Sequence, residues 1–304
     1  MAMNTDDRRA SWTIYETYMA MCREAVPPIV DHETLLRLAS RSLEAAPPSH
    51  RYDAIVVDEA QDITEAGVRF LIQLLEGGTA GRLLLVGDGG QRIYPGGYRL
   101  ADLGLDVRGR SSVLRLCYRS TDEIMSAVGS LGRWLSLEEY GEDGLGQVEV
   151  STLRVGAKPQ LRRFASPEAE LIWLAEVLDP DDPDLDATAV LAPTNAKVEA
   201  LARRVRDAGL GAVLLTDYTG RAMPGVKVGT YNRAKGLEFK RVILPGLDTS
   251  MPWGRQEDID NVLLQGGQLY VAMSRARDEL LLSHTGEPSL YLEPLAPTID
   301  AVDA

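Results

Sequence analysis

Short apolar runs alternate with helical segments along most of this 304-residue chain. Most of the runs are three to five residues long and rich in leucine and valine, which is typical of buried strands. Strands that alternate with helices predict an α/β fold with a largely parallel sheet. The predicted strands are 54–57, 82–86, 112–116, 160–164, 189–192, 226–230, 242–244 and 279–283.

Helical periodicity and breaker residues place the helices between these strands. Two further helices precede the first strand, with Pro27-Pro28 between them and Pro47-Pro48 after the second. Ser166 stands where an N-cap is expected. The tail after Glu287 is rich in proline and is expected to be loosely held. The predicted helices are 12–24, 31–46, 65–75, 121–134, 167–178, 196–208 and 260–274.

Length and composition are those of an ordinary globular protein of about two domains. No apolar stretch approaches the ~20 residues of a membrane-spanning helix, and the polar N-terminus carries no signal-peptide core. Cys22 and Cys117 are too few for a disulfide framework, and no cysteine–histidine cluster suggests zinc. We therefore expect no membrane association and a reducing, cytoplasmic setting.

The chain is acidic, with a net charge of −13 and a pI near 4.8. This balance argues against a generally basic surface for nucleic acid. A local basic groove stays compatible with it, because phosphate contacts depend on local charge. The simplest interpretation of the net charge is a well-solvated acidic surface.

Two adjacent carboxylates, Asp58 and Glu59, directly follow the predicted strand 54–57. Ligands of an open parallel sheet sit at the carboxyl ends of its strands. Asp58 could hold Mg²⁺, mainly through water, because Mg²⁺ keeps several of its waters. Glu59 could orient or deprotonate an attacking water. The pair therefore indicates a phosphate-cleaving ATPase, and the alternative is two solvated acids at a strand end.

Two more strands end in polar blocks. The strand 82–86 leads into GDGGQRIY, where glycines permit close backbone approach, Gln91 could bond a phosphate oxygen and Tyr94 could face a base. After the strand 112–116 come Tyr118 and Arg119, a residue for purine stacking and a planar fork suited to phosphate. Taken alone, the first block is also compatible with a simple glycine turn between a strand and a loop. The tripeptide Tyr118-Arg119-Ser120 is too short to be a specific signal by itself.

The last two blocks are TYNRAKGLEF at residues 230–239 and YVAMSRAR at residues 270–277. In most proteins a lone arginine such as Arg275 would be a surface charge. The order of the five blocks is far more specific than any one of them.

Together the five blocks resemble motifs II to VI of the superfamily 1 helicases of the UvrD/Rep type. The matching segments are DEAQD, LLLVGDGGQRIY, LRLCYRS, TYNRAKGLEF and LYVAMSRARDEL, and the resemblance covers about residues 12–285. It implies two RecA-like domains of the P-loop NTPase type, with parallel sheets, flanking helices and ATP between them. The domains it implies are a helical lead-in at 1–50, an incomplete first RecA-like domain at 51–137, a second at 138–287 and a tail at 288–304.

The resemblance also implies a reaction and a set of site residues. ATP hydrolysis with Mg²⁺ would drive 3′→5′ movement on single-stranded DNA. The implied roles are Asp58 as the Mg²⁺ carboxylate, Glu59 as catalytic base, Gln61 and Gln91 as couplers of the γ-phosphate to DNA, Arg119 and Arg275 as arginine fingers, Tyr118 on adenine, Glu238 on the ribose with Gly236 beside the nucleotide, and Tyr94 and Thr230 on DNA.

One departure from the family is large, because no GxxxxGK[ST] phosphate loop, or Walker A segment, occurs in the chain. That loop supplies an N–H cradle, a lysine and a magnesium ligand. We therefore expect the motif II–VI part of a helicase, either truncated or complemented by a separate polypeptide, which is inactive alone and binds ATP and Mg²⁺ if it is complemented by a Walker A segment. The alternative is a catalytically degenerate helicase-like module that binds DNA or protein.

The missing loop also has a structural consequence. In the RecA-like strand order, the phosphate-loop strand separates strands 82–86 and 112–116. Buried backbone groups need partners and exposed apolar edges promote association. These two strands are therefore expected either to pair directly or to be completed by another chain.

Overall fold

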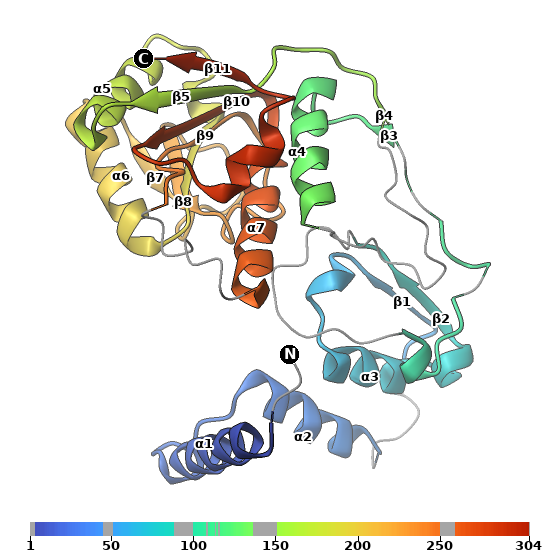
Figure 1. Ribbon diagram of the computed structural model, residues 1–304. Helices are drawn as coiled ribbons and strands as arrows, with labels where there is room; N and C mark the ends of the chain where they lie inside the picture. The colour runs from blue at the N-terminus through green and yellow to red at the C-terminus, as the bar shows by residue number, and fades with distance from the viewer. Residues whose placement is uncertain are drawn as a thin grey trace. The chain divides into compact units, whose positions relative to one another are not determined.

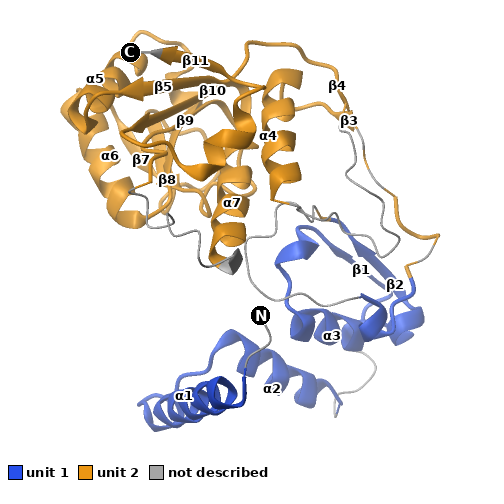
Figure 2. Ribbon diagram, viewed as in Figure 1, with its two compact units in different colours: residues 1–86, 96–106 blue, residues 87–95, 107–304 orange. Residues whose placement is uncertain are grey.

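The computed structural model of the protein describes residues 4–44, 51–87, 100–107, 109–112, 114, 116–135, 151–249 and 259–303. The chain divides into two compact units, residues 1–86 with 96–106 and residues 87–95 with 107–304 (Figure 2). We describe each unit by itself. Helix α4 (Asp122–Trp134) belongs to the second unit, and the domain boundary near residue 137 stays a prediction.

A seven-stranded sheet forms the centre of the second unit, in the order β11-β5-β10-β9-β6-β8-β7 (Figure 1). Every pairing in it is parallel. This confirms the predicted α/β fold with a RecA-like parallel sheet flanked by helices. The strands are β5 (Gln160–Phe164), β6 (Thr188–Ala192), β7 (Ala212–Leu214), β8 (Val226–Thr230), β9 (Phe239–Leu244), β10 (Ala276–Thr285) and β11 (Asp300–Asp303).

Alternate residues of the central strands enter two different cores. Leu191 of β6 packs in a core with α4 and α7, whereas its neighbour Val190 packs in a core with α5 and α6. Figure 1 shows these two pairs of helices on opposite sides of the sheet. Burial on both faces explains why the strands have no polar alternation. The remaining helices are α5 (Pro167–Val177), α6 (Asn195–Asp207) and α7 (Ile259–Met273).

Two of these helices begin at side-chain caps. Ser166 Oγ accepts a hydrogen bond from the Ala169 amide at 3.2 Å, and Pro167 is the first residue of α5. Thr194 Oγ1 accepts one from the Lys197 amide at 3.3 Å at the start of α6. The predicted N-cap at Ser166 is confirmed, and such caps satisfy amides that the helix leaves unpaired.

The end of the chain is packed, which corrects the expectation of a loosely held tail. The 3₁₀ helix Leu290–Leu295 buries Tyr291, whose ring meets Trp134 of α4 edge-on at 5.9 Å. Strand β11 then pairs with β5 at the sheet edge. Apolar residues between the prolines provide buried area that outweighs the ordering cost, so proline content misled the prediction.

The first unit holds a two-stranded parallel sheet, with β1 and β2 paired from Ala54↔Arg82 to Val57↔Leu85. One face packs with Val68 of α3 in a small core. On the other face, Val56 and Leu84 are 70% and 54% exposed. Its elements are α1 (Thr5–Glu24), α2 (His32–Glu44), β1 (Ala54–Val57), α3 (Glu65–Leu74) and β2 (Arg82–Leu85). No described helix is both long enough and apolar enough to cross a membrane.

Two short strands in the second unit correct a further expectation. Strand β3 (Leu116–Cys117) pairs in parallel with β4 (Ser151–Thr152), and β2 pairs with β1. Of the two outcomes expected for strands 82–86 and 112–116, direct pairing is wrong for the residues that the structure describes, and completion by another chain stays a prediction. The two-residue strand β4 has no sequence signal of its own, which is why this partner was missed.

A partly buried ion-pair network in the second unit predicts a pH-dependent stability. Arg241 of β9 contacts Glu279 and also Asp182, with Nη1 and Oδ2 of that second pair 2.5 Å apart. The hydrogen bond from the Asp184 amide, reinforced by Arg241, holds the pKa of Asp182 below its ordinary value. A carboxylate with a lowered pKa stabilises the fold above its unfolded pKa of about 3.9 and loses that effect as pH falls through the folded pKa.

We therefore expect Asp182→Asn to lower the urea midpoint at pH 7, with a smaller difference from the wild-type chain below about pH 4. Urea unfolding followed by circular dichroism between pH 7 and pH 3 measures this difference. A difference that stays constant over the whole range would contradict the role of the Asp182 carboxylate.

Candidate functional site

The carboxylates Asp58 and Glu59 lie at the carboxyl end of β1, as predicted. The Val86 amide donates to the Val57 carbonyl at 2.8 Å, and the Ala60 amide donates to the Val86 carbonyl at 2.9 Å. These two bonds hold the acidic turn against the end of β2. Asp58 Oδ1 accepts the Glu59 amide at 2.9 Å, and its side chain is exposed to solvent.

Glu59 has a left-handed backbone, with φ 52° and ψ 40°. It is the one non-glycine residue with positive φ among those described. This conformation costs roughly 1–2 kcal/mol in a residue with a Cβ, and such strain is concentrated at functional sites. The turn aims the Glu59 side chain toward Gln61, whose Nε2 donates to Glu59 Oε2 at 2.5 Å.

Gln61 is 2% exposed, so it is a buried partner of a half-buried carboxylate. The resemblance assigns it to coupling between the γ-phosphate and DNA, whereas the geometry shows that it orients Glu59. Gln61 donates to Oε2 of Glu59, and a carboxylate has a second oxygen that can accept a proton from water.

The acidic turn fits a magnesium ion held largely by water. In the described part of the chain, no three carboxylate, imidazole or thiol groups gather into a metal site. Asp58 alone presents an exposed carboxylate at the strand end. One carboxylate with several retained waters and substrate phosphates is an ordinary Mg²⁺ environment.

In the second unit, two of the predicted arginines contact the same short loop, Leu237-Glu238. Arg119, which follows β3, pairs through Nε with Glu238 Oε2 at 2.6 Å. Both side chains are about half exposed, at 50% and 46%. Glu238 directly precedes β9, so this pair joins the segment after β3 to the loop before β9.

Arg275 also binds this loop. Its Nη1 donates to the Leu237 carbonyl at 3.4 Å, and its Nε donates to the Val271 carbonyl at 3.1 Å. Its Nη2 donates to Ser274 Oγ at 2.9 Å. The residue is 2% exposed, which excludes the interpretation of Arg275 as a surface charge. Two guanidinium groups therefore converge on Leu237-Glu238.

The other predicted residues of the second unit lie near this loop or precede it in sequence. Gly236 has φ 76°, which suits glycine at the turn into Leu237. Thr230 ends β8, and its Oγ1 accepts the Arg233 amide at 3.3 Å. Tyr118 is 70% exposed, so its ring is available for stacking. The predicted residues Gln91 and Tyr94 lie outside the described residues.

A neighbouring tyrosine in the block 230–239 is structural. Tyr231 follows Thr230, is 1% exposed and packs in the core with α4 and α7. Burial raises the pKa of its hydroxyl, so it stays protonated at all ordinary pH values. The block thus combines a core side chain with the polar residues of the candidate site.

Sequence reasoning missed one residue of this arrangement. Arg154 lies in none of the five blocks, yet its guanidinium contacts the carbonyl of Arg119 at 2.5 Å and the carboxylate of Asp278 at 2.5 Å. An isolated arginine after a predicted loop carries no signal of such contacts. Only the parallel pairing of β3 with β4 brings it beside Arg119.

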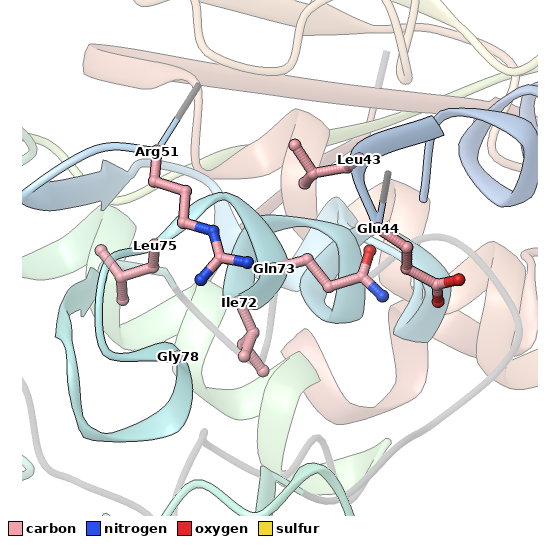
Figure 3. Close-up of a pocket in the computed structure, with 7 residues that line it drawn as sticks. All are labelled: Leu43, Glu44, Arg51, Ile72, Gln73, Leu75 and Gly78. Atoms are coloured by element: carbon pink, nitrogen blue, oxygen red, sulfur yellow. The ribbon is translucent and has the colours of Figure 1, made fainter. Parts of the chain in front are cut away.

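A small pocket in the first unit is separate from the predicted site. Its volume is about 210 Å³, and it lies between the end of α2 and helix α3 (Figure 3). None of the predicted site residues lines it. Its lining residues are Leu43, Glu44, Arg51, Ile72, Gln73, Leu75 and Gly78.

Comparisons with known proteins match both units. The UvrD/REP helicase N-terminal domain model matches residues 2–106, and the UvrD-like helicase C-terminal domain model matches residues 216–287. None of the curated proteins matches the chain. One similar solved structure is the C-terminal domain of a possible DNA helicase from Lactobacillus plantarum WCFS1. It is 24% identical with a TM-score of 0.46, over 60% of this chain and 98% of that one.

The left-handed backbone at Glu59 predicts an unusual response to substitution. Glu59→Gly and Glu59→Ala both remove the carboxylate and its bond to Gln61, but only alanine keeps the cost of positive φ. We expect Glu59→Gly to be more stable than Glu59→Ala by about 1 kcal/mol in urea unfolding.

The matched control is the same pair at Glu65, the first residue of α3. There the backbone is helical, so glycine is expected to be the less stable variant by roughly 0.5–1 kcal/mol. Equal stability of the two Glu59 variants would show that the turn relaxes and stores no strain.

Proposed function

This chain belongs to the UvrD/Rep helicase family, and from this membership we propose that it is the motif II–VI part of an ATP-dependent helicase that moves 3′→5′ on single-stranded DNA. One observation carries the proposal. Family residues with complementary chemistry are gathered in both units, carboxylates at the end of β1 and guanidinium groups at Leu237-Glu238.

In this proposal, the residues of the acidic turn bind the metal and activate the attacking water. Asp58 would hold Mg²⁺, which would neutralise charge on the phosphates, and Glu59 would accept the proton of the attacking water while Gln61 keeps its carboxylate in place. MgATP, when bound, supplies the phosphoanhydride whose cleavage drives movement. The strained backbone of Glu59 supports this role, because such conformations persist where the surrounding structure holds a functional side chain.

Arg119 and Arg275 bind the negatively charged phosphates in this proposal. Arg119 exchanges the Glu238 carboxylate for a phosphate oxygen, and this exchange is easy because a half-exposed ion pair contributes only about 0–1 kcal/mol. Glu238 is then free to accept from the ribose hydroxyls. Arg275, already fixed on backbone carbonyls, provides a second preorganised charge.

Base and DNA contacts complete the proposed assignment. Tyr118 stacks on adenine, which its exposed ring allows. Thr230, at the carboxyl end of β8, contacts the DNA strand, together with Tyr94. The acidic chain then binds DNA through local contacts rather than through overall charge.

We propose that the phosphate loop, which these 304 residues do not contain, is supplied by a segment outside them, either continuous with this chain or on a separate polypeptide. The two-stranded sheet of the first unit supports this view, since parallel sheets are normally covered on both faces and wider than two strands. Its apolar face with Val56 and Leu84 offers a place for further secondary structure. A strand, phosphate loop and helix form a unit of the required kind.

A second function is favoured by the absence of the loop together with the carboxylate that occupies Arg119. In that case the chain is a helicase-like module that binds DNA or protein without turnover. The two functions differ in whether Glu59 ever contributes to ATP hydrolysis.

We expect the isolated chain to hydrolyse ATP negligibly, with or without single-stranded DNA, because it has no N–H cradle for the phosphates. A coupled assay for ADP release measures this, with Glu59→Gln as the matched control. DNA-stimulated turnover that Glu59→Gln abolishes would contradict the prediction.

Coexpression with the Walker A segment of a UvrD/Rep relative tests the split helicase directly. We expect DNA-stimulated ATP hydrolysis to appear, and Glu59→Gln to lower it by about 10²-fold or more. A Walker A segment whose lysine is replaced controls for hydrolysis by contaminants. Association of the two polypeptides without any turnover would favour the binding module instead.

A further inference from the structure

Residues 151–156 run beside the segment that carries Arg119. Strand β4 pairs with β3, and beyond it the Asp122 amide donates to the Arg154 carbonyl at 2.8 Å. The Gly156 amide then donates to Glu123 Oε2 at 2.8 Å. The 151–156 segment is therefore bonded first to β3 and then to the start of helix α4.

Arg154 extends these bonds across to the strand that follows Arg275. Its Nη1 donates to the Arg119 carbonyl at 2.5 Å and to the Arg277 carbonyl at 3.4 Å. Its Nη2 pairs with Asp278 Oδ1 at 2.5 Å. A planar guanidinium suits such acceptors, because its donors point in fixed directions.

Other bonds join the same two segments just after Arg119. Ser120 Oγ donates to the Ala276 carbonyl at 2.7 Å, and the Thr121 amide donates to the Arg277 carbonyl at 3.2 Å. Arg154 adds a bond to the carbonyl of Arg119 itself. The backbone of Arg119 is thereby set relative to the strand that begins directly after Arg275.

We propose that Arg154 is a positioning residue, which fixes the backbone of Arg119 so that the Arg119 guanidinium is held on the Leu237-Glu238 loop that Arg275 also contacts. The proposal rests on the proposed function for the role of the two arginines in binding phosphate. The geometry itself is independent of that role. Arg154 acts through Arg119 and touches no reacting atom.

Because the Arg154–Asp278 ion pair is partly exposed, a positioning role of Arg154 can be distinguished from a contribution to overall stability. The side chains of Arg154 and Asp278 are 36% and 34% exposed, so their ion pair adds little to overall stability. Lysine at position 154 keeps the charge but has no planar fork to join Arg119, Arg277 and Asp278. A charge-conserving variant therefore tests geometry rather than electrostatics.

The experiment uses the full chain labelled with ¹⁵N, free of nucleotide. Arg154→Ala and Arg154→Lys are compared with Arg203→Ala, which removes an exposed arginine of α6 outside this network. The readouts are the Nε–H resonance of Arg119, which reports its pair with Glu238, and hydrogen exchange of the Thr121 amide. Amides of Val190 and Leu282 report the stability of the central strands.

We expect both Arg154 variants to move the Arg119 Nε–H resonance toward that of a free arginine and to speed Thr121 exchange by about tenfold or more. Val190 and Leu282 are expected to keep wild-type exchange. If Arg154→Ala does not fold, Arg154→Lys decides the outcome. An Arg119 resonance unchanged in Arg154→Lys, as in Arg203→Ala, overturns the proposal, and so does a uniform rise of exchange at the Thr121, Val190 and Leu282 amides.

These outcomes do not depend on ATP hydrolysis. If coexpression with a Walker A segment gives no turnover while Arg119 still responds, the positioning role stands and only the proposed function is contradicted. If coexpression gives turnover but Arg119 does not respond, the positioning role is contradicted and the proposed function stands.

Discussion

Burial of the parallel strands on both faces is the constraint on which the second unit depends. Strands β6, β9 and β10 send alternate apolar side chains into two cores, so a polar group inside the sheet needs a bonded partner, as Ser283 of β10 has in Glu170. The polar residues of the candidate site lie at strand ends and in connecting loops. Glu238 before β9 and Arg275 before β10 occupy such positions.

The candidate site shows how a loop becomes a rigid binding element. Leu237-Glu238 is held by Arg275 through a carbonyl and by Arg119 through a carboxylate, and Arg154 ties the Arg119 backbone to the strand after Arg275. In the first unit, Gln61 holds Glu59 in a strained turn. In both units, buried or bonded partners position a more exposed functional side chain, which is how preorganised sites are built.

Sequence reasoning succeeded where one local rule decided the outcome. The strand Val226–Thr230 and the helix cap at Ser166 were predicted because apolar runs and capping residues act over a few neighbours. It failed for the packed tail around Tyr291, where tertiary burial outweighed proline content. It also failed for β3, because the two-residue partner β4 carries no pattern of its own.

The amino-acid sequence alone determined the α/β fold and the family, because five blocks in fixed order depend on residue types and spacing. It also placed Asp58 and Glu59 at a strand end. Only the tertiary structure decided that Gln61 holds Glu59, that Arg119 pairs with Glu238, and that Arg154 belongs to the site. These contacts join residues whose side-chain directions or distant partners follow from backbone geometry, which no local sequence pattern encodes.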